Sequence, residues 1–171
     1  FSKTIHALDS TTIQLVANCM DWAKHRRRKA AAKCHLRLNL QSFLPKCAII
    51  DTAKHHDSKK AQALCNDLQS GEIAVFDKAY TQFRHLFELN ERGIWWVGRA
   101  KDNMNYRVLR ELETTSHKRI LRDEIIEMVL DKSKEAYPIA LRRVTALVEV
   151  KRCPGNGVFA GVRVIDVGQP N

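Results

Sequence analysis

The feature that most constrains the fold is the order in which β-type and helix-type segments follow one another. Three β-type segments come first, at residues 5–16, 32–40 and 46–52, with no helix between them. Such neighbours pair antiparallel. From residue 57 the pattern changes, because apolar residues recur at helical spacing and alternate with short apolar segments. The sequence therefore predicts a sheet that begins antiparallel and continues parallel.

The later pattern consists of two helix–strand units. One helix is predicted over residues 57–68 and a second over residues 80–90, ending at Gly93. The strands that follow them, at 72–76 and 94–97, are almost wholly apolar, as expected for strands buried on both faces. Parallel strands joined through helices cross over in the right-handed sense. The order β-β-β-α-β-α-β predicts an α/β fold, a mixed five-stranded sheet flanked by helices.

The pattern of predicted elements changes again after the fifth strand, where further strands predominate. Residues 119–130, 138–150 and 158–167 are predicted to be strands, although the first has a composition that fits a helix as well. The sequence thus predicts two parts, an α/β part at residues 1–110 and a β-rich segment at residues 111–171.

The charge of the chain indicates its class of binding partner, and its cysteine content indicates its cellular compartment. The chain has 29 Lys and Arg against 19 Asp and Glu, a net charge of +10, which favours a polyanionic partner, either nucleic acid or an anionic membrane surface. Charge alone leaves open a merely solvated basic surface. No apolar stretch of about 18 residues is present, so a membrane partner is not expected. Five scattered cysteines without a CxxC fit a reducing cytoplasm.

Two aspartates are the candidate chemical groups. Asp9 interrupts an apolar strand, and Asp77 directly follows a buried one. A buried-strand carboxylate is costly unless a cation or hydrogen bonds compensate it. If the two strands are neighbours, both carboxylates lie at one edge and hold Mg²⁺ or Mn²⁺. The alternative, which spacing alone favours, is that each aspartate caps a turn or a helix.

Short motifs in a characteristic order carry a family resemblance: ALDSTTI at 7–13, AKCHL at 32–36, HHDSK at 55–59, VFDKAY at 75–80 and WVGRAKDN at 96–103. Together they resemble the DDE transposases of bacterial insertion sequences, in the cut-and-paste group with a β-rich insertion. Asp9 matches the first aspartate of that family, in a D-S-T-like motif. Asp77 matches the second, in a D-(R/K)-G-Y-like motif in which Ala79 replaces the usual glycine. The resemblance covers residues 5 to about 110 and is weaker to about 150.

The resemblance implies an RNase H-like fold with sheet order 3-2-1-4-5, in which residues 1–110 are a partial catalytic core and residues 111–171 are part of the β-rich insertion. It also implies metal-dependent phosphodiester cleavage and strand transfer at insertion-sequence ends, with Mg²⁺ or Mn²⁺ bound by Asp9, Asp77 and a glutamate. The implied partners are transposon-end and target DNA and a second copy in a homodimer. The implied location is the bacterial cytoplasm, in association with the nucleoid.

Several residues are predicted to contact DNA. The resemblance points to a basic strand exit of R-x-K-x-N type and to the tyrosine of the second motif. The cluster at residues 24–29 adds charge that can bind phosphates, with a solvated loop as an equal alternative. The predicted set is Tyr80, Arg99, Lys101, Asn103, Arg26, Arg27 and Arg28.

One departure from the family affects activity. The third carboxylate of the family is a glutamate in a Y-x2-R-x3-E-x6-K signature, and no such signature occurs here; no Glu follows Glu149. The chain is therefore expected to be inactive on its own. The alternatives to a transposase core are a non-catalytic DNA-binding remnant and another RNase H-like nuclease.

Overall fold

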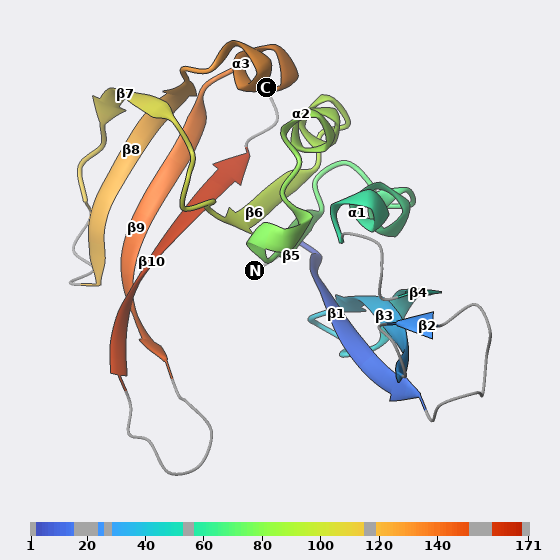
Figure 1. The fold of residues 1–171 in the computed structure, drawn as a ribbon. Coiled ribbons are helices and arrows are strands. Elements are labelled where there is room, and N and C mark those ends of the chain that lie inside the picture. Colours follow the sequence, from blue (N-terminus) through green and yellow to red (C-terminus); the bar gives the residue numbers. More distant parts are fainter. Residues whose placement is uncertain are drawn as a thin grey trace.

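Strands dominate the computed structural model, which describes residues 3–15, 24–25, 29–52, 57–114, 119–150 and 159–168 (Figure 1). The strands are β1 Ile5–Leu15, β2 Lys24–His25, β3 Lys29–Asn39, β4 Pro45–Thr52, β5 Ile73–Phe76, β6 Trp95–Arg99, β7 Tyr106–Glu111, β8 Ile120–Met128, β9 Leu141–Val150 and β10 Phe159–Gly168. The helices are α1 Ser58–Cys65, α2 Phe83–Glu91, α3 Asp131–Ala136 and the short 3-10 helix η2 Lys78–Tyr80. No helix in these ranges has the length and apolarity needed to cross a membrane.

The first five predicted strands form the predicted sheet. β4 pairs with β3 and β3 with β1, both antiparallel, and β1 then pairs in parallel with β5 and β5 with β6. This order, β4-β3-β1-β5-β6, is the expected 3-2-1-4-5 arrangement of an RNase H-like fold. The short strand β2 also pairs with β3 and was not predicted.

The β-rich segment continues the same sheet. β10 pairs antiparallel with β6, and β9, β8 and β7 follow in turn. Within the predicted range 119–130, residues Ile120–Met128 form a strand, β8, which settles the ambiguity between strand and helix. The sequence did not predict β7 or α3. The division of the chain near residue 110 stays a prediction, and in the structure hydrogen bonding crosses it.

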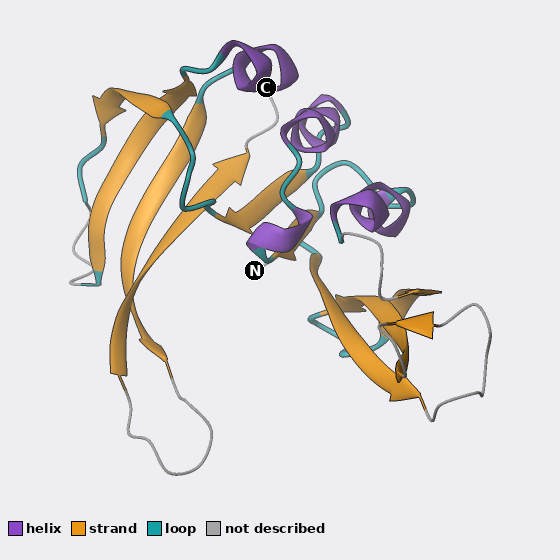
Figure 2. Cartoon of the chain, in the orientation of Figure 1, coloured by secondary structure: helices purple, strands orange, loops and turns teal. Residues whose placement is uncertain are grey.

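The helices lie along one side of the sheet and bury its apolar core (Figure 2). Leu64 of α1 and Leu86 and Leu89 of α2 have no exposed surface and pack onto the same cluster as Phe76 and Trp96. Burial of this apolar surface is the main driving force for folding. The alternation along β5 and β6 leaves the opposite face of the sheet only partly buried.

Beneath α1 the same face is polar, which corrects the prediction for the second strand. The alternation of Leu36, Leu38 and Leu40 with Arg37 and Asn39 predicted a half-exposed strand with its polar residues on one side. The structure buries that polar side, and Arg37 is 2% exposed.

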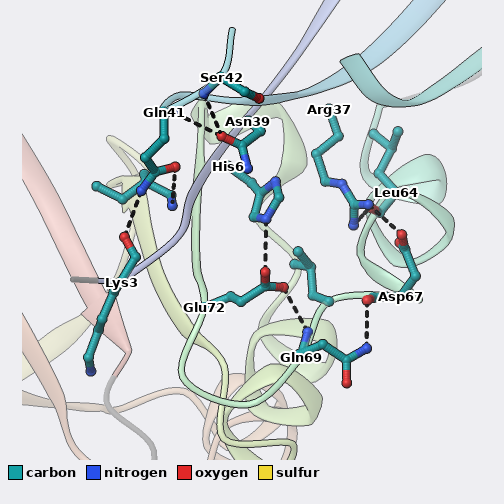
Figure 3. Close-up of polar contacts among 12 residues, drawn as sticks. Lys3, His6, Arg37, Asn39, Gln41, Ser42, Leu64, Asp67, Gln69 and Glu72 are labelled. Carbon is teal, nitrogen blue, oxygen red and sulfur yellow. Dashed lines mark hydrogen bonds and ion pairs between the residues drawn. The ribbon is translucent and has the colours of Figure 1, made fainter. Parts of the chain in front are cut away.

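Groups at the end of α1 bond two of the three guanidinium nitrogens of the buried Arg37, and its Nε has no hydrogen-bond partner among the described residues (Figure 3). Arg37 donates to the backbone oxygen of Leu64 (2.9 Å) and to Oδ2 of Asp67 (2.6 Å). The hydrogen bond from Arg37 lowers the pKa of Asp67. A second pair, His6 Nε2 and Glu72 Oε1 at 3.3 Å, lies on the same side of the sheet. These contacts attach α1 and the following loop to the strands.

Gly93 follows the end of α2 in a backbone conformation and a close packing that favour glycine. Its φ is +71°, and a Cβ built there lies 2.4 Å from Ser70 Oγ and 3.2 Å from Ser70 Cβ. We expect Gly93→Ala to lower the free energy of unfolding by about 2 kcal/mol, through backbone strain plus this clash. Urea denaturation measures the loss.

Gly71→Ala is the matched control. The Gly71 N–H donates to Gly93 O, its φ is +86°, and a Cβ there meets nothing within 4 Å. It carries the strain without the clash, so about 1 kcal/mol is expected. Equal losses for the two variants would show that Ser70 moves aside freely.

Candidate active site

The two candidate aspartates lie side by side at one edge of the sheet. The parallel ladder between β1 and β5 ends with the pair Leu8 and Phe76, and Asp9 and Asp77 are the next residues of the two strands. Leu8 and Phe76 are buried on the helix-covered face. Because successive side chains alternate, Asp9 and Asp77 point to the opposite face. Both residues are exposed.

Arg99 extends this row to a third strand. The ladder between β5 and β6 pairs Phe76 with Gly98, so Arg99 stands next to Asp77 as Asp77 stands next to Asp9. Arg99 Nη1 lies 3.5 Å from Asp77 Oδ1, and both side chains are partly exposed. Asp9 Oδ1 accepts the backbone N–H of Ser10 at 2.7 Å. The edge thus presents two carboxylates and one guanidinium on one face.

A pocket of about 520 Å³ adjoins Asp77, lined by Asp77, Lys78, Ala79, Lys101, Asp102 and Asn103. Lys78 Nζ lies 2.5 Å from Asp102 Oδ2 across it, and this contact lowers the pKa of Asp102. Two of the predicted DNA-contacting residues, Lys101 and Asn103, are therefore in the pocket wall beside Asp77. Their cationic and amide groups are suited to phosphate oxygens.

The departure at Ala79 has a simple structural reason. Ala79 lies in η2, and among the described non-glycine residues only Phe43 has a positive φ. No left-handed conformation is needed at position 79, so alanine fits there without strain.

Tyr80 was among the residues predicted to contact DNA, and the structure buries it. Its side chain is 1% exposed, and its hydroxyl lies 3.0 Å from Nδ1 of His35, which is equally buried. A side chain enclosed in this way faces the core, so we place Tyr80 in the support of the strand edge rather than on the DNA surface. His35 is thus both packed and hydrogen-bonded. Arg26, Arg27 and Arg28 lie outside the described residues, as do His55 and His56.

Sequence reasoning missed the contacts of Asp57 with Ser10 and Lys33. Asp57 occupies the N-cap position of α1 without a capping side-chain hydrogen bond. Its carboxylate instead accepts from Ser10 Oγ (3.3 Å) and lies 2.5 Å from Lys33 Nζ. The adjacency of Ser10 to Asp9 and of Asp57 to the HH pair was visible in the sequence, but their contact was not.

The described residues contain no cluster of three or more His, Cys, Asp or Glu side chains arranged to hold a metal ion. The edge therefore offers Asp9 and Asp77 as a pair of oxygen ligands. Hard cations such as Mg²⁺ bind through one or two carboxylates together with water and substrate phosphates, so the pair fits this class of ion.

Comparison with known proteins identifies the family. A probable transposase for insertion sequence element IS5377 of Geobacillus stearothermophilus is 28% identical over 116 residues, covering 68% of this chain. A putative transposase, y4zB, of Sinorhizobium fredii is 27% identical over 158 residues, covering 90%. The chain spans 30% and 42% of the lengths of these two relatives.

Among solved structures, the cryo-EM structure of the piggyBac transposase synaptic complex with hairpin DNA aligns with a TM-score of 0.48 at 11% identity. The alignment covers 95% of this chain and 32% of that one. The family model described as "Transposase DDE domain" matches residues 1–148. The chain therefore belongs to the DDE-domain transposases.

Proposed function

We propose that this chain forms the aspartate-bearing part of a transposase active site, which cleaves phosphodiesters and transfers strands at insertion-sequence ends. The observation that carries the proposal is the register of β1, β5 and β6, which supports a shared role for Asp9 and Asp77 at one edge and on one face. The family membership supports this reading over another RNase H-like nuclease.

Asp9 and Asp77 would hold a divalent cation, Mg²⁺ or Mn²⁺, as members of this family generally use. When bound, such an ion activates the attacking oxygen and stabilises the leaving oxygen of the phosphodiester. The D-D-E pattern requires a third carboxylate, which the described residues do not supply at this edge. We therefore propose that the chain alone does not cleave DNA.

The other groups at the edge would bind and orient the DNA. Arg99 is held beside Asp77 and can donate to phosphate oxygens on the same face. Lys101 and Asn103 line the adjoining pocket, which places further donors along the path of a backbone. Homodimer formation and contact with both transposon ends and target DNA belong to the same proposal.

Titration with Mn²⁺ tests the proposal. We expect weak binding by the wild-type chain, in the millimolar range, and about tenfold weaker binding by Asp77→Asn, because the variant removes one of only two anionic ligands. Electron paramagnetic resonance of free Mn²⁺ gives the dissociation constants.

Asp102→Asn is the matched control, since it also removes one carboxylate from the wall of the same pocket. Asp102 is paired with Lys78, so its loss should leave Mn²⁺ affinity within about twofold. Equal affinities of the wild-type and Asp77→Asn chains would refute the metal site.

A non-catalytic DNA-binding role is the second candidate. It is favoured by the net charge of +10 and by the presence of only two carboxylates at the described edge. Under this reading the chain binds DNA while Asp77→Asn leaves Mn²⁺ affinity unchanged, so the same titration separates the two candidates.

A further inference from the structure

Behind the aspartate edge, on the helix-covered face, lies a buried polar cluster. His35 of β3 and Tyr80 of η2 are each 1% exposed, with Nδ1 and the phenolic oxygen 3.0 Å apart and the rings edge to face at 85°. Burial lowers the pKa of His35 and raises the pKa of Tyr80 to about 12, so both side chains are neutral near pH 7. Their contact is a hydrogen bond between uncharged groups.

The His35–Tyr80 contact is one branch of this cluster, and the contacts of Asp57 form the second. The Asp57 side chain is 11% exposed, accepts a hydrogen bond from Ser10 Oγ, and lies 2.5 Å from Lys33 Nζ and 3.8 Å from His35 Nδ1. Ser10 and His35 are direct cross-strand partners in the β1–β3 ladder. One cluster therefore joins β1, β3, the start of α1 and η2.

Each branch ends close to one of the aspartates. Ser10 follows Asp9 directly, and the Ser10 N–H already donates to Asp9 Oδ1. Tyr80 closes the short turn that begins at Asp77, since the Tyr80 N–H donates to Asp77 O at 3.0 Å. A displacement of Ser10 or Tyr80 would therefore move the backbone that carries the corresponding carboxylate.

We propose that Tyr80, His35, Asp57 and Ser10 are positioning residues that hold Asp9 and Asp77 at the separation needed to share a divalent cation. This inference rests on the proposed function. Burying polar side chains such as Tyr80 and His35 is costly compared with burying apolar ones, and packing alone does not call for them here. A cation site requires ligands held within about 0.5 Å, which rigid hydrogen bonds behind the ligands provide.

The test compares Mn²⁺ affinity in Tyr80→Phe with that in Tyr137→Phe. Tyr137 is also 1% exposed, and Tyr137→Phe removes the hydroxyl that accepts a hydrogen bond from Asn90 Nδ2. The Tyr137 ring packs edge to face against Trp96 and Phe87. We expect Tyr80→Phe to weaken Mn²⁺ binding about tenfold, and Tyr137→Phe to leave it within twofold, at similar losses of melting temperature. Equal Mn²⁺ affinities of Tyr80→Phe and the wild-type chain would overturn the proposal.

Ser10→Ala provides a second test should Tyr80→Phe fail to fold, because Ser10 is only partly buried. It should also weaken Mn²⁺ binding, and Ser10→Thr, which keeps the hydroxyl, should restore it. Loss of affinity in Ser10→Thr equal to that in Ser10→Ala would overturn the role of the hydroxyl. If Asp77→Asn itself leaves Mn²⁺ binding unchanged, the proposed function fails; if only the positioning variants leave it unchanged, this inference alone fails.

Discussion

Replacing Trp96 by alanine is expected to lower the free energy of unfolding by about 4 kcal/mol, close to the limit of what a single domain of this size tolerates. Trp96 is 1% exposed and stacks on Phe76 with ring centroids 6.2 Å apart. Its indole N–H donates to Asn90 Oδ1, and Asn90 in turn donates to the Tyr137 hydroxyl. The substitution would leave a large cavity and an unsatisfied buried amide oxygen. Urea denaturation at equilibrium gives the value.

Trp95→Ala is the matched control, because it removes the same side chain from the neighbouring position of the same strand. Trp95 points to the other face, is only partly buried, and has Lys3 Nζ 4.1 Å above its ring. A loss of about 1 kcal/mol is expected. Similar losses for the two variants would contradict the assignment of the two rings to opposite faces.

The pair of tryptophans also shows what the sequence could predict. One ring of IWWV on each face follows from the alternation of side chains alone. The burial on both faces that this apolar run predicted is only partial, because Trp95 is partly exposed. The same reasoning predicted β1, β3, β4 and β5 to within a few residues. The sheet order came from the family resemblance, since local pattern does not choose strand neighbours.

Other elements carried too little local signal. All six residues of β7 are exposed, so it shows no alternation, and its strand form depends on pairing with β8. The helix α3 has six residues and none of them is buried, so it lacks an apolar periodicity. Arg37 looked like a solvent-facing residue because its partners, Leu64 O and Asp67, lie 27 and 30 residues away in the chain.

In the candidate site, too, the features with a local sequence signal were predicted and those that depend on tertiary contacts were not. Asp9 and Asp77 were singled out because each interrupts or follows an apolar strand, which is a local feature, but their role as a metal-binding pair came from the family resemblance. The position of Arg99 beside Asp77 and the contact between Ser10 and Asp57 depend on register and on the path of α1, which only the coordinates give. Tyr80 was assigned to DNA because its motif is adjacent to Asp77, whereas the turn of η2 directs its ring into the core.

Affinity for duplex DNA is expected to fall about 100-fold as salt rises from about 50 to about 200 mM. The slope of log affinity against log salt is about −0.9 for each phosphate contacted, and about four contacts give this loss. Arg99 and Lys101 at the described edge and the arginines at 26–28 are the cations available for them. Fluorescence anisotropy of a labelled duplex across a salt series measures the slope.

Lys101→Ala should reduce that slope by about 1, because it removes one phosphate contact beside Asp77. Lys46→Ala removes the same charge from an exposed position on β4, at the opposite edge of the five-stranded core from β6. The net charge of the two variants is identical, so any difference between their slopes reports where the DNA lies and not how basic the chain is. If the DNA backbone runs along the Asp77 pocket, Lys101→Ala lowers the slope more than Lys46→Ala does. Equal slopes for the two variants would mean that DNA binds the basic surface diffusely.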